Sequence, residues 1–217
     1  MSENPFDIIY SNNQQYFGEH PVNLLKDYFS LCDKRGRILD IGIGQGRNAR
    51  FLLKQGYGVD GIEPSSVAAN ILKAAVEDEK LDLRIYNIGF EDFACTPRTY
   101  SAILLLGLFP VLSENQIHML AKKTKRWLKK KGLVFVTGFT SKEQNFRPSG
   151  KQWIKMDTDS YHDGEGNYRT LLDLDNAMSK FKKFKPIYHY EGLGEVHNHG
   201  TDISEQHHIF EFILQKA

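Results

Sequence analysis

Residues 37–63 constrain the fold of this chain more than any other part of the sequence. They read RILDIGIGQGRNARFLLKQGYGVDGIE. The apolar run at 38–41 is typical of a short strand, and glycines follow at alternate positions. Residues 47–55 then repeat apolar side chains at helical spacing, and a second strand-like segment at 58–62 ends before Glu63. The pattern predicts a strand, a glycine turn, a helix and a second strand.

The spacing of the polar groups in this unit predicts the kind of ligand it binds. Gly42, Gly44 and Gly46 let the backbone turn tightly and approach a ligand closely. Glu63, at the tip of the second strand, is placed to accept hydrogen bonds from both hydroxyls of a ribose. Asp40 precedes the loop, where a carboxylate would repel a diphosphate but would hold an ammonium group. We therefore expect a nucleoside joined to an amino acid, as in S-adenosylmethionine.

A dinucleotide is the alternative ligand for a glycine loop. Its fingerprint, G-x-G-x-x-G, requires a third glycine where the helix packs on the strand. Counted from Gly42, that position is occupied by Arg47. The spacing therefore disfavours a nicotinamide-dependent dehydrogenase.

The segment DIGIGQG, residues 40–46, resembles motif I of the class I S-adenosylmethionine-dependent methyltransferases. The longer string at 44–60 resembles the tellurite-resistance (TehB-type) group and its small-molecule relatives. Gly194-Glu195-Val196-His197 is similar to the G-E-L-H that precedes the last strand in that group. The resemblance implies an α/β, Rossmann-like fold: a mostly parallel seven-stranded sheet with an antiparallel last strand and helices on both faces.

The rest of the chain fits one domain over residues 1–217. Strands are expected at 81–86, 100–106 and 133–139, with helices at 21–31, from Pro64 and Ser65 to 76, at 113–128 and at 171–181. This alternation predicts a parallel sheet with right-handed crossovers. Segments 186–190 and 208–214 read as two strands without a helix between them, which favours antiparallel pairing.

Two segments are expected outside this alternation. Residues 1–31 would form an N-terminal lid and helix; the resemblance implies that an aromatic-glycine pair such as Phe17-Gly18 folds over the cofactor, whereas plain packing of the aromatics on the core is the alternative. Residues 140–169 are polar and rich in Gly, Asp and Ser, with four interspersed aromatics. We expect an inserted loop there, part of it mobile, over the substrate pocket.

The resemblance extends to the cofactor site and to catalysis. It implies that the loop after the third strand holds the adenine, with Asn87, Phe90 and Glu91 as candidates, and that His197 is the catalytic residue. No metal ligands are expected. The full set of candidate cofactor-binding residues is Phe17, Asp40, Gly42, Gly44, Gly46, Arg47, Asn48, Glu63, Pro64, Asn87, Phe90, Glu91 and Leu106.

The methyl acceptor is expected to be a small molecule. Enzymes that methylate exocyclic amines of bases carry an N-P-P-Y-like tetrad after the fourth strand, where this chain has Leu-Gly-Leu-Phe at 106–109. These side chains suggest an uncharged, partly apolar molecule or a thiol. In the tellurite-resistance group an Arg follows the histidine and another comes later; Asn198 and Glu205 stand there, which argues against an oxyanion. A non-catalytic module or sensor that binds S-adenosylmethionine or S-adenosylhomocysteine is the alternative function.

Composition sets the remaining expectations. The formal net charge is +1, from 28 basic and 27 acidic residues, so no overall field recruits nucleic acid or an acidic membrane. Cys32 and Cys95 lack metal-type spacing and suit a reducing compartment. The first residues show no secretory signal, and no apolar run approaches a membrane span. We expect a cytoplasmic monomer or homodimer.

Overall fold

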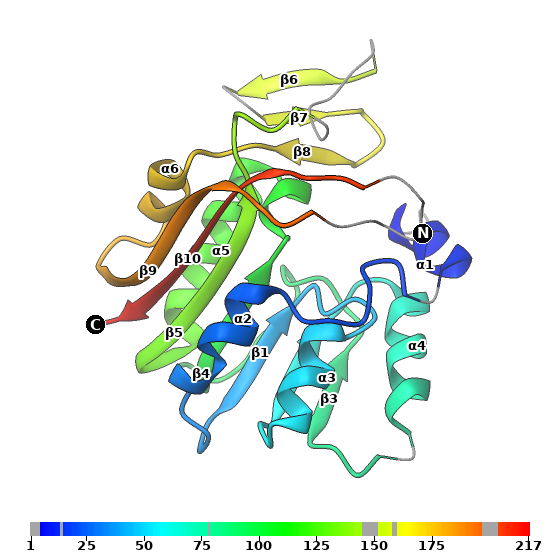
Figure 1. Cartoon of the computed structure of the whole chain (residues 1–217), viewed down its shortest axis with the longest axis vertical. Coiled ribbons are helices and arrows are strands. Elements are labelled where there is room, and N and C mark those ends of the chain that lie inside the picture. Colours follow the sequence, from blue (N-terminus) through cyan, green and yellow to red (C-terminus); the bar gives the residue numbers. More distant parts are fainter. Residues whose placement is uncertain (1–4, 14, 78, 145–151, 158–159, 197–203) are drawn as a thin grey trace.

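The computed structural model describes residues 5–13, 15–77, 79–144, 152–157, 160–196 and 204–217. In this part of the chain a seven-stranded sheet runs in the order β3-β2-β1-β4-β5-β10-β9 (Figure 1). Its strands are β1 (Arg37–Ile41), β2 (Val59–Ile62), β3 (Leu83–Tyr86), β4 (Tyr100–Leu106), β5 (Leu128–Phe139), β9 (Phe184–Leu193) and β10 (His208–Lys216).

The pairing of the strands confirms the predicted topology. Neighbours from β3 to β5 are parallel, whereas β10 is antiparallel to both β5 and β9. Parallel strands are buried on both faces, and six of the seven residues of β4 are buried accordingly. The carboxyl ends of β1, β2, β4 and β5 therefore meet at one edge of the sheet, where ligands bind in open α/β folds.

Helices cover both faces of the sheet, as predicted. On one face α2 (Asn23–Tyr28), the short 3₁₀ helix η1 (Phe29–Leu31), α3 (Arg47–Lys54) and α4 (Ser66–Val76) contribute to one apolar core, which includes Leu25, Leu52 and Leu72. On the other face α5 (Glu114–Trp127) and α6 (Leu174–Ser179), with the 3₁₀ helix η2 (Phe109–Val111), pack in a second core. The hydrophobic stripes of the helices set these two layers.

Two helix starts follow the capping signals in the sequence. Ser113 and Gln116 form a capping box at the start of α5. Ser65 is the N-cap of α4 and accepts a hydrogen bond from the backbone N–H of Ala68 at 3.1 Å, so the helix begins one residue after it. Pro64 lies outside the helix, at the end of the β2 turn.

The prediction of an irregular loop at 140–169 is wrong for its second half. β6 (Ile154–Asp157), β7 (Ser160–His162) and β8 (Tyr168–Thr170) form a separate antiparallel sheet, which stands above the main one in Figure 1. The polar run between β7 and β8 is a tight turn, in which the Asp163 side chain accepts hydrogen bonds from the backbone N–H groups of Glu165 and Asn167. The Gly, Asp and Asn residues that suggested an irregular loop therefore form the turn of a hairpin.

Three other elements differ from the sequence prediction. β5 begins at Leu128 rather than at 133, so the basic residues after α5 lie on a strand. The helix predicted at 171–181 is shortened to α6, since Leu171 and Leu172 are buried outside it. A helix not predicted, α1 (Pro5–Asn12), precedes α2 and contacts α4. No helix in the described residues is both long and apolar enough to cross a membrane.

Candidate functional site

The glycine loop connects β1 to α3 at the carboxyl edge of the sheet. Gly42, Gly44 and Gly46 all adopt positive φ, which confirms that the alternate glycines make a tight turn. The backbone N–H of Gly42 donates to the carbonyl of Ile62 at 2.9 Å, which ties the loop to the end of β2. Gly46 is the N-cap of α3, so the loop leads directly into the helix.

Glu63 lies at the end of β2 with its side chain turned to the loop. It is only 4% exposed, and its two carboxylate oxygens accept hydrogen bonds from the backbone N–H groups of Gly44 and Ser65, both at 2.8 Å. Burial raises the pKa of this carboxyl, while the two backbone hydrogen bonds oppose the shift. Each oxygen keeps a second lone pair, so the carboxylate is fixed in place and still able to accept hydrogen bonds from a diol.

Asp40 carries the least satisfied charge of the site. The side chain is 2% exposed, and its Oδ2 has no hydrogen-bond partner among the described residues. Burial, and then the nearby Glu63 carboxylate, raise the pKa of Asp40 from 3.8 to about 7. A buried carboxyl without a partner is unfavourable, and a ligand ammonium would compensate it. This group fits the amino-acid half of the predicted cofactor.

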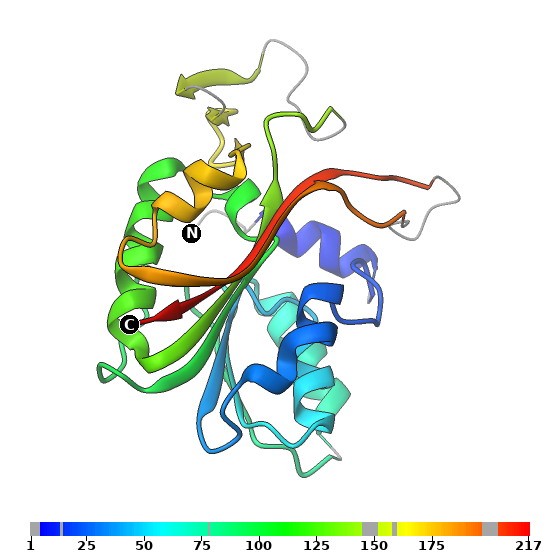
Figure 2. The same cartoon turned by 60° about the vertical axis from the view of Figure 1, so that its left-hand side comes forward.

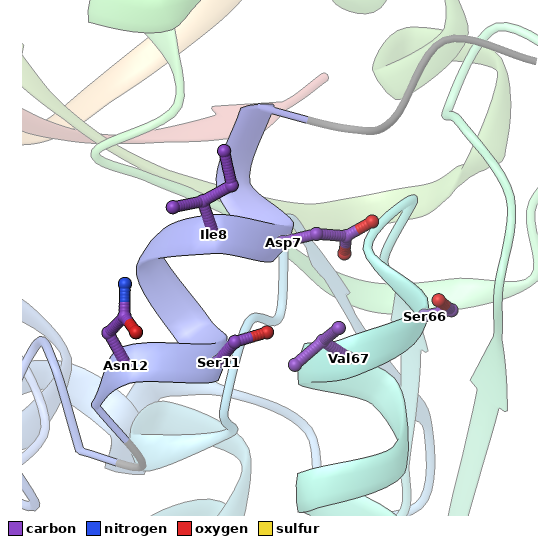
Figure 3. Close-up of a pocket in the computed structure, with 6 residues that line it drawn as sticks. All are labelled: Asp7, Ile8, Ser11, Asn12, Ser66 and Val67. Atoms are coloured by element: carbon purple, nitrogen blue, oxygen red, sulfur yellow. The ribbon is translucent and has the colours of Figure 1, made fainter.

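The N-terminal segment packs over the glycine loop. Tyr10 of α1 is buried, and a Cβ built on Gly44 would lie 3.0 Å from its hydroxyl. The Ser65 hydroxyl donates to the carboxylate of Asp7. Figure 3 shows Asp7 and Ser11 on the side of α1 that faces Ser66 and Val67 of α4; a groove of about 540 Å³ lies between the two helices. The N-terminal segment is therefore positioned at the end of β2, beside the predicted ligand.

Side chains of the glycine loop and of the first residues of α3 hold this segment. Gln45 donates from its side-chain amide to the carbonyl of Asn13 at 2.7 Å and accepts from the N–H of Tyr16 at 3.0 Å. Arg47 donates to the carbonyl of Phe17 at 2.7 Å, and its guanidinium lies 5.8 Å from the centre of the Phe17 ring. Asn48 accepts from the N–H of Val22 at 3.0 Å. We refer to these contacts of Gln45, Arg47 and Asn48 as the loop latch.

The loop after β3 is placed beside the end of β2, but its candidates separate. The Asn87 side chain donates to the carbonyls of Glu63 and Pro64, at 2.8 and 3.2 Å. Phe90 is buried in the core on the α5 face. Glu91 accepts a hydrogen bond from the Gln116 side chain at 2.8 Å. Of the three candidates, Asn87 is therefore the one that contacts the Glu63 turn directly, whereas Phe90 and Glu91 are bound to α5 and the core.

Lys123 of α5 fixes that same loop. Its ammonium donates to the carbonyls of Phe90, Glu91 and Phe93 at 3.1, 2.6 and 3.1 Å, and it lies 5.3 Å from the centre of the Trp127 ring. Lys123, although part of the basic run at 122–131, is therefore a structural donor.

Lys123→Met is expected to lower the free energy of unfolding by about 1–3 kcal/mol, because it keeps the aliphatic stem but leaves three carbonyls without their donor. Urea denaturation measures the change. The exposed neighbour provides the control, since Lys122→Met should shift stability by less than about 0.5 kcal/mol. Equal stability of the two variants would contradict the capping role.

The segment after β4 differs from the expected apolar mouth. Leu106 is half-buried at the strand end, and the N–H of Gly107 donates to the Thr137 hydroxyl at 2.8 Å. A Cβ on Gly42 would lie 3.3 Å from Leu108, so this side chain faces the glycine loop. Phe109, however, is 1% exposed and packs on Phe181 and Phe210. The expectation that Phe109 lines the acceptor site is wrong, because the opposite core takes its ring.

His197, the predicted catalytic residue, lies outside the described residues. Near it in sequence, the start of β10 carries a polar cluster at the end of β5. Buried Glu143 accepts from the N–H of His208 at 2.6 Å and lies 3.2 Å from the His207 ring nitrogen. The Thr140 hydroxyl and the His208 ring are 2.6 Å apart. These contacts join the loop after β5 to β10 on the edge that also carries the glycine loop.

Sequence reasoning missed Tyr10 and Gln45 as members of the site. Neither residue was among the candidates that the sequence suggested. The one available signal was the position of Gln45 between Gly44 and Gly46, within the loop that was expected to bind the ligand. Nothing local marks Tyr10, since its placement depends on the packing of α1 on α4.

Comparison with known proteins shows what the chain is similar to. Residues 38–132 match the family model described as "Methyltransferase domain". No curated protein matches the chain. Many solved structures do, including a SAM-dependent methyltransferase from Methanosarcina mazei, with 17% sequence identity and a TM-score of 0.71 over 91% of this chain and 98% of that one.

Two further structures carry informative names. TehB from Haemophilus influenzae has 18% identity and a TM-score of 0.66, over 90% of this chain and 62% of that one. The 1,6-didemethyltoxoflavin-N1-methyltransferase of Burkholderia thailandensis was solved with its substrate and S-adenosylhomocysteine bound. It has 12% identity and a TM-score of 0.60, over 83% of this chain and 71% of that one. At these identities the likeness establishes the fold.

Proposed function

We propose that the chain is a class I S-adenosylmethionine-dependent methyltransferase and that it transfers a methyl group to a small-molecule acceptor. The matched methyltransferase domain at residues 38–132 and the fold shared with solved methyltransferases support this proposal. The observation that carries the proposal is the pair of buried carboxylates on either side of the glycine loop. Glu63 is fixed by two backbone N–H groups at one end, and Asp40 at the other end has no hydrogen-bond partner for its Oδ2 in the described part of the chain. The pair is complementary to a molecule with a diol at one end and an ammonium at the other.

Bound S-adenosylmethionine supplies a methyl group already activated as part of a sulfonium. The protein then has to align the acceptor behind this carbon and to exclude water. Glu63 and Asp40 would fix the two ends of the cofactor. The N-terminal segment, held by the loop latch and by Tyr10, would cover it on the side of α1. No further catalytic group is required unless the acceptor must lose a proton, and His197 remains our candidate base for that step.

The acceptor would enter over the carboxyl ends of β4 and β5. Leu108 provides an apolar surface next to Gly42, and the Glu143, His207 and His208 cluster provides polar groups farther along the edge. One of the solved structures with this fold has a name that includes a small-molecule acceptor: the 1,6-didemethyltoxoflavin-N1-methyltransferase. We therefore propose a neutral acceptor with one apolar side, such as a thiol or a heterocyclic amine.

Calorimetric titration with S-adenosylhomocysteine tests the cofactor assignment. The wild type is expected to bind it and not NADH. Glu63→Ala is expected to weaken binding by more than about tenfold, or 1.4 kcal/mol, because the diol loses its acceptor and the Gly44 and Ser65 N–H groups lose theirs. Glu77→Ala, which removes an exposed carboxylate after α4, is the matched control and should bind as the wild type does.

Turnover is tested next with labelled S-adenosylmethionine and a panel of thiols, selenite and small heterocycles. Transfer of label to a thiol or a heterocycle supports the proposed acceptor class, whereas transfer to selenite alone would contradict it. Failure of the wild type to bind S-adenosylhomocysteine would overturn the whole assignment. Tight binding without transfer to any acceptor would favour a sensor that holds the cofactor.

A further inference from the structure

The overall charge of +1 conceals a basic end of the main sheet. β4, β5 and β9 begin at this end and β10 finishes there, since the register pairs Lys216 of β10 with Phe184 of β9 (Figure 1). It is the end opposite the carboxyl edge that carries the glycine loop. Basic residues of several elements gather there. We call six of them the basic end: Arg98, Lys125, Lys131, Lys183, Lys185 and Lys216.

Hydrogen bonds hold members of the basic end close together. The Lys216 ammonium donates to the carbonyls of Lys125 and Leu128, both at 2.6 Å. The N–H of Arg98 donates to the carbonyl of Arg126 at 3.0 Å. Burial, and then the charges of Arg98 and Lys125, lower the pKa of Lys216. These cations therefore repel one another, and no carboxylate of the described residues forms an ion pair with any of the six.

The backbone provides a second, independent observation. In the described part of the chain, the residues other than glycine with positive φ are Arg98, Lys131 and Lys183, at 61°, 62° and 73°. All three belong to the basic end. A residue with a Cβ is strained in this left-handed conformation, which glycine adopts freely. Glycine would relieve the strain at each position, so the backbone alone does not account for a basic residue there.

The three strained residues present their charges from three separate connections. Arg98 lies in the turn before β4, Lys131 in a bulge of β5 formed by residues 129–132, and Lys183 in the turn between α6 and β9. All three side chains are exposed. Neighbouring strands lie about 4.8 Å apart, so the row from β4 to β9 extends over roughly 15 Å. This length exceeds one phosphate group and fits several successive phosphates, which follow every 3.4 Å or about that along one strand of DNA.

The surroundings of the six cations decide which polyanion fits. The aromatic rings that border them in sequence, Trp127 and Phe184, are buried and half-buried in the core on the α5 face. A protein interface usually has an aromatic or apolar centre and is depleted in lysine. Single-stranded nucleic acid is bound by stacking on exposed rings, and membrane-surface segments insert apolar side chains. A duplex requires only cations that meet its phosphates.

We propose that the basic end binds the phosphate backbone of a double-stranded nucleic acid without reading its sequence. The strained turns hold the cations in a row, and the repulsion among them is relieved when phosphates lie between them. This surface is at the opposite end of the strands from the glycine loop. The nucleic acid is therefore a docking partner and not the methyl acceptor, and the inference goes beyond the proposed function.

Fluorescence anisotropy on the full chain, with short labelled duplexes of RNA and of DNA, tests the proposal. Six phosphate contacts predict a slope of about −5 for the logarithm of affinity against the logarithm of salt concentration. The triple variant Arg98→Gly/Lys131→Gly/Lys183→Gly is expected to bind at least about tenfold more weakly at low salt, with a slope near about −3. Its thermal unfolding midpoint should stay the same or rise, because glycine relieves the strain. A purely structural role would lower that midpoint.

Lys26→Ala/Lys54→Ala/Lys73→Ala is the matched control, since it removes three exposed charges from α2, α3 and α4. Its affinity for the duplexes should stay within about twofold of the wild type, because salt screens distant charges. Equal losses in the two triple variants would overturn the proposal, since binding would then follow net charge alone. Binding of only one duplex by the wild type supports it and identifies the source of the phosphates.

A wild type that binds neither duplex would overturn the proposal. Vesicles containing phosphatidylserine and poly-glutamate are measured in parallel, and binding to either without binding to a duplex would assign the surface to a lipid or to an acidic protein instead. Both triple variants should bind S-adenosylhomocysteine as the wild type does, because neither changes the glycine loop. Failure of the duplex test therefore leaves the proposed function standing.

Discussion

Asp40→Asn is expected to make the free protein more stable and to make it lose its cofactor. The wild-type carboxyl is buried, no described residue is a hydrogen-bond partner of its Oδ2, and its pKa is raised from 3.8 to about 7. A carboxyl with a raised pKa in the folded state favours folding when protonated and opposes it when ionised. Its penalty is therefore absent below pH 3.8, grows from there to about pH 7, and is complete above pH 7.

The stability gain of Asp40→Asn should follow that window. From the linkage relation, the advantage of the variant should be roughly 2.5 kcal/mol larger at pH 8 than at pH 5. Urea denaturation at the two pH values, without ligand, measures it. Asp27→Asn, which changes an exposed acid of α2, should show no such difference. A variant that is less stable than the wild type at pH 8 would contradict the unpartnered state of Asp40.

Asp40→Asn should weaken cofactor binding although it stabilises the free protein. S-adenosylhomocysteine is expected to bind Asp40→Asn roughly a hundredfold more weakly, about 2.7 kcal/mol, because its ammonium loses the buried counter-charge. For the wild type, affinity should fall as the pH drops below about 7. Asp40 is then protonated in the free protein, and binding of the ligand ammonium has to release that proton. Retained affinity in the variant would show that the ammonium is held elsewhere.

Gly46→Ala is expected to be the most destabilising substitution in the loop. Gly46 has φ +83°, and a Cβ would lie 2.4 Å from Leu72 Cδ1 and 2.8 Å from its Cδ2. Leu72 is fully buried in α4, so its side chain can move only by displacing neighbouring core atoms. Backbone strain of about 1 kcal/mol and overpacking of about 1–3 kcal/mol should add to a loss of roughly 2–4 kcal/mol.

A substitution at Gly56 separates the backbone strain from the overpacking. It has the same φ of +83°, but no atom lies within 4 Å of its Cβ position. Gly56→Ala should therefore cost only the strain, about 1 kcal/mol. Urea denaturation of both variants gives the difference. Equal losses would mean that α4 shifts to accommodate the methyl group, and that the loop is less tightly packed than the structure shows.

The sequence predicted the elements whose signals are local. β4 was predicted at its observed bounds because a continuous apolar run is typical of a central parallel strand. The glycine turn and the capping box at Ser113 follow from backbone requirements of single residues. The fold class followed from these elements together with the motif resemblance.

The parts that could not be predicted depend on distant contacts. An aromatic after a strand has the same local pattern whether it faces a ligand or a core, and only contacts such as that of Phe109 with Phe181 decide between the two. The eight residues of α1 form too short a helix to be stable alone, so packing on α4 determines it. Tyr10 could not be assigned to the site for that reason.

The loop latch has an evolutionary consequence. On the glycine-loop side its donors and acceptors are side chains, those of Gln45, Arg47 and Asn48. On the N-terminal side they are the main-chain groups of residues 13, 16, 17 and 22. Main-chain groups are the same in every residue except proline at its N–H. Among homologues, we therefore expect the N-terminal segment to vary freely in sequence while keeping its position, and selection to act on the three side chains that hold it.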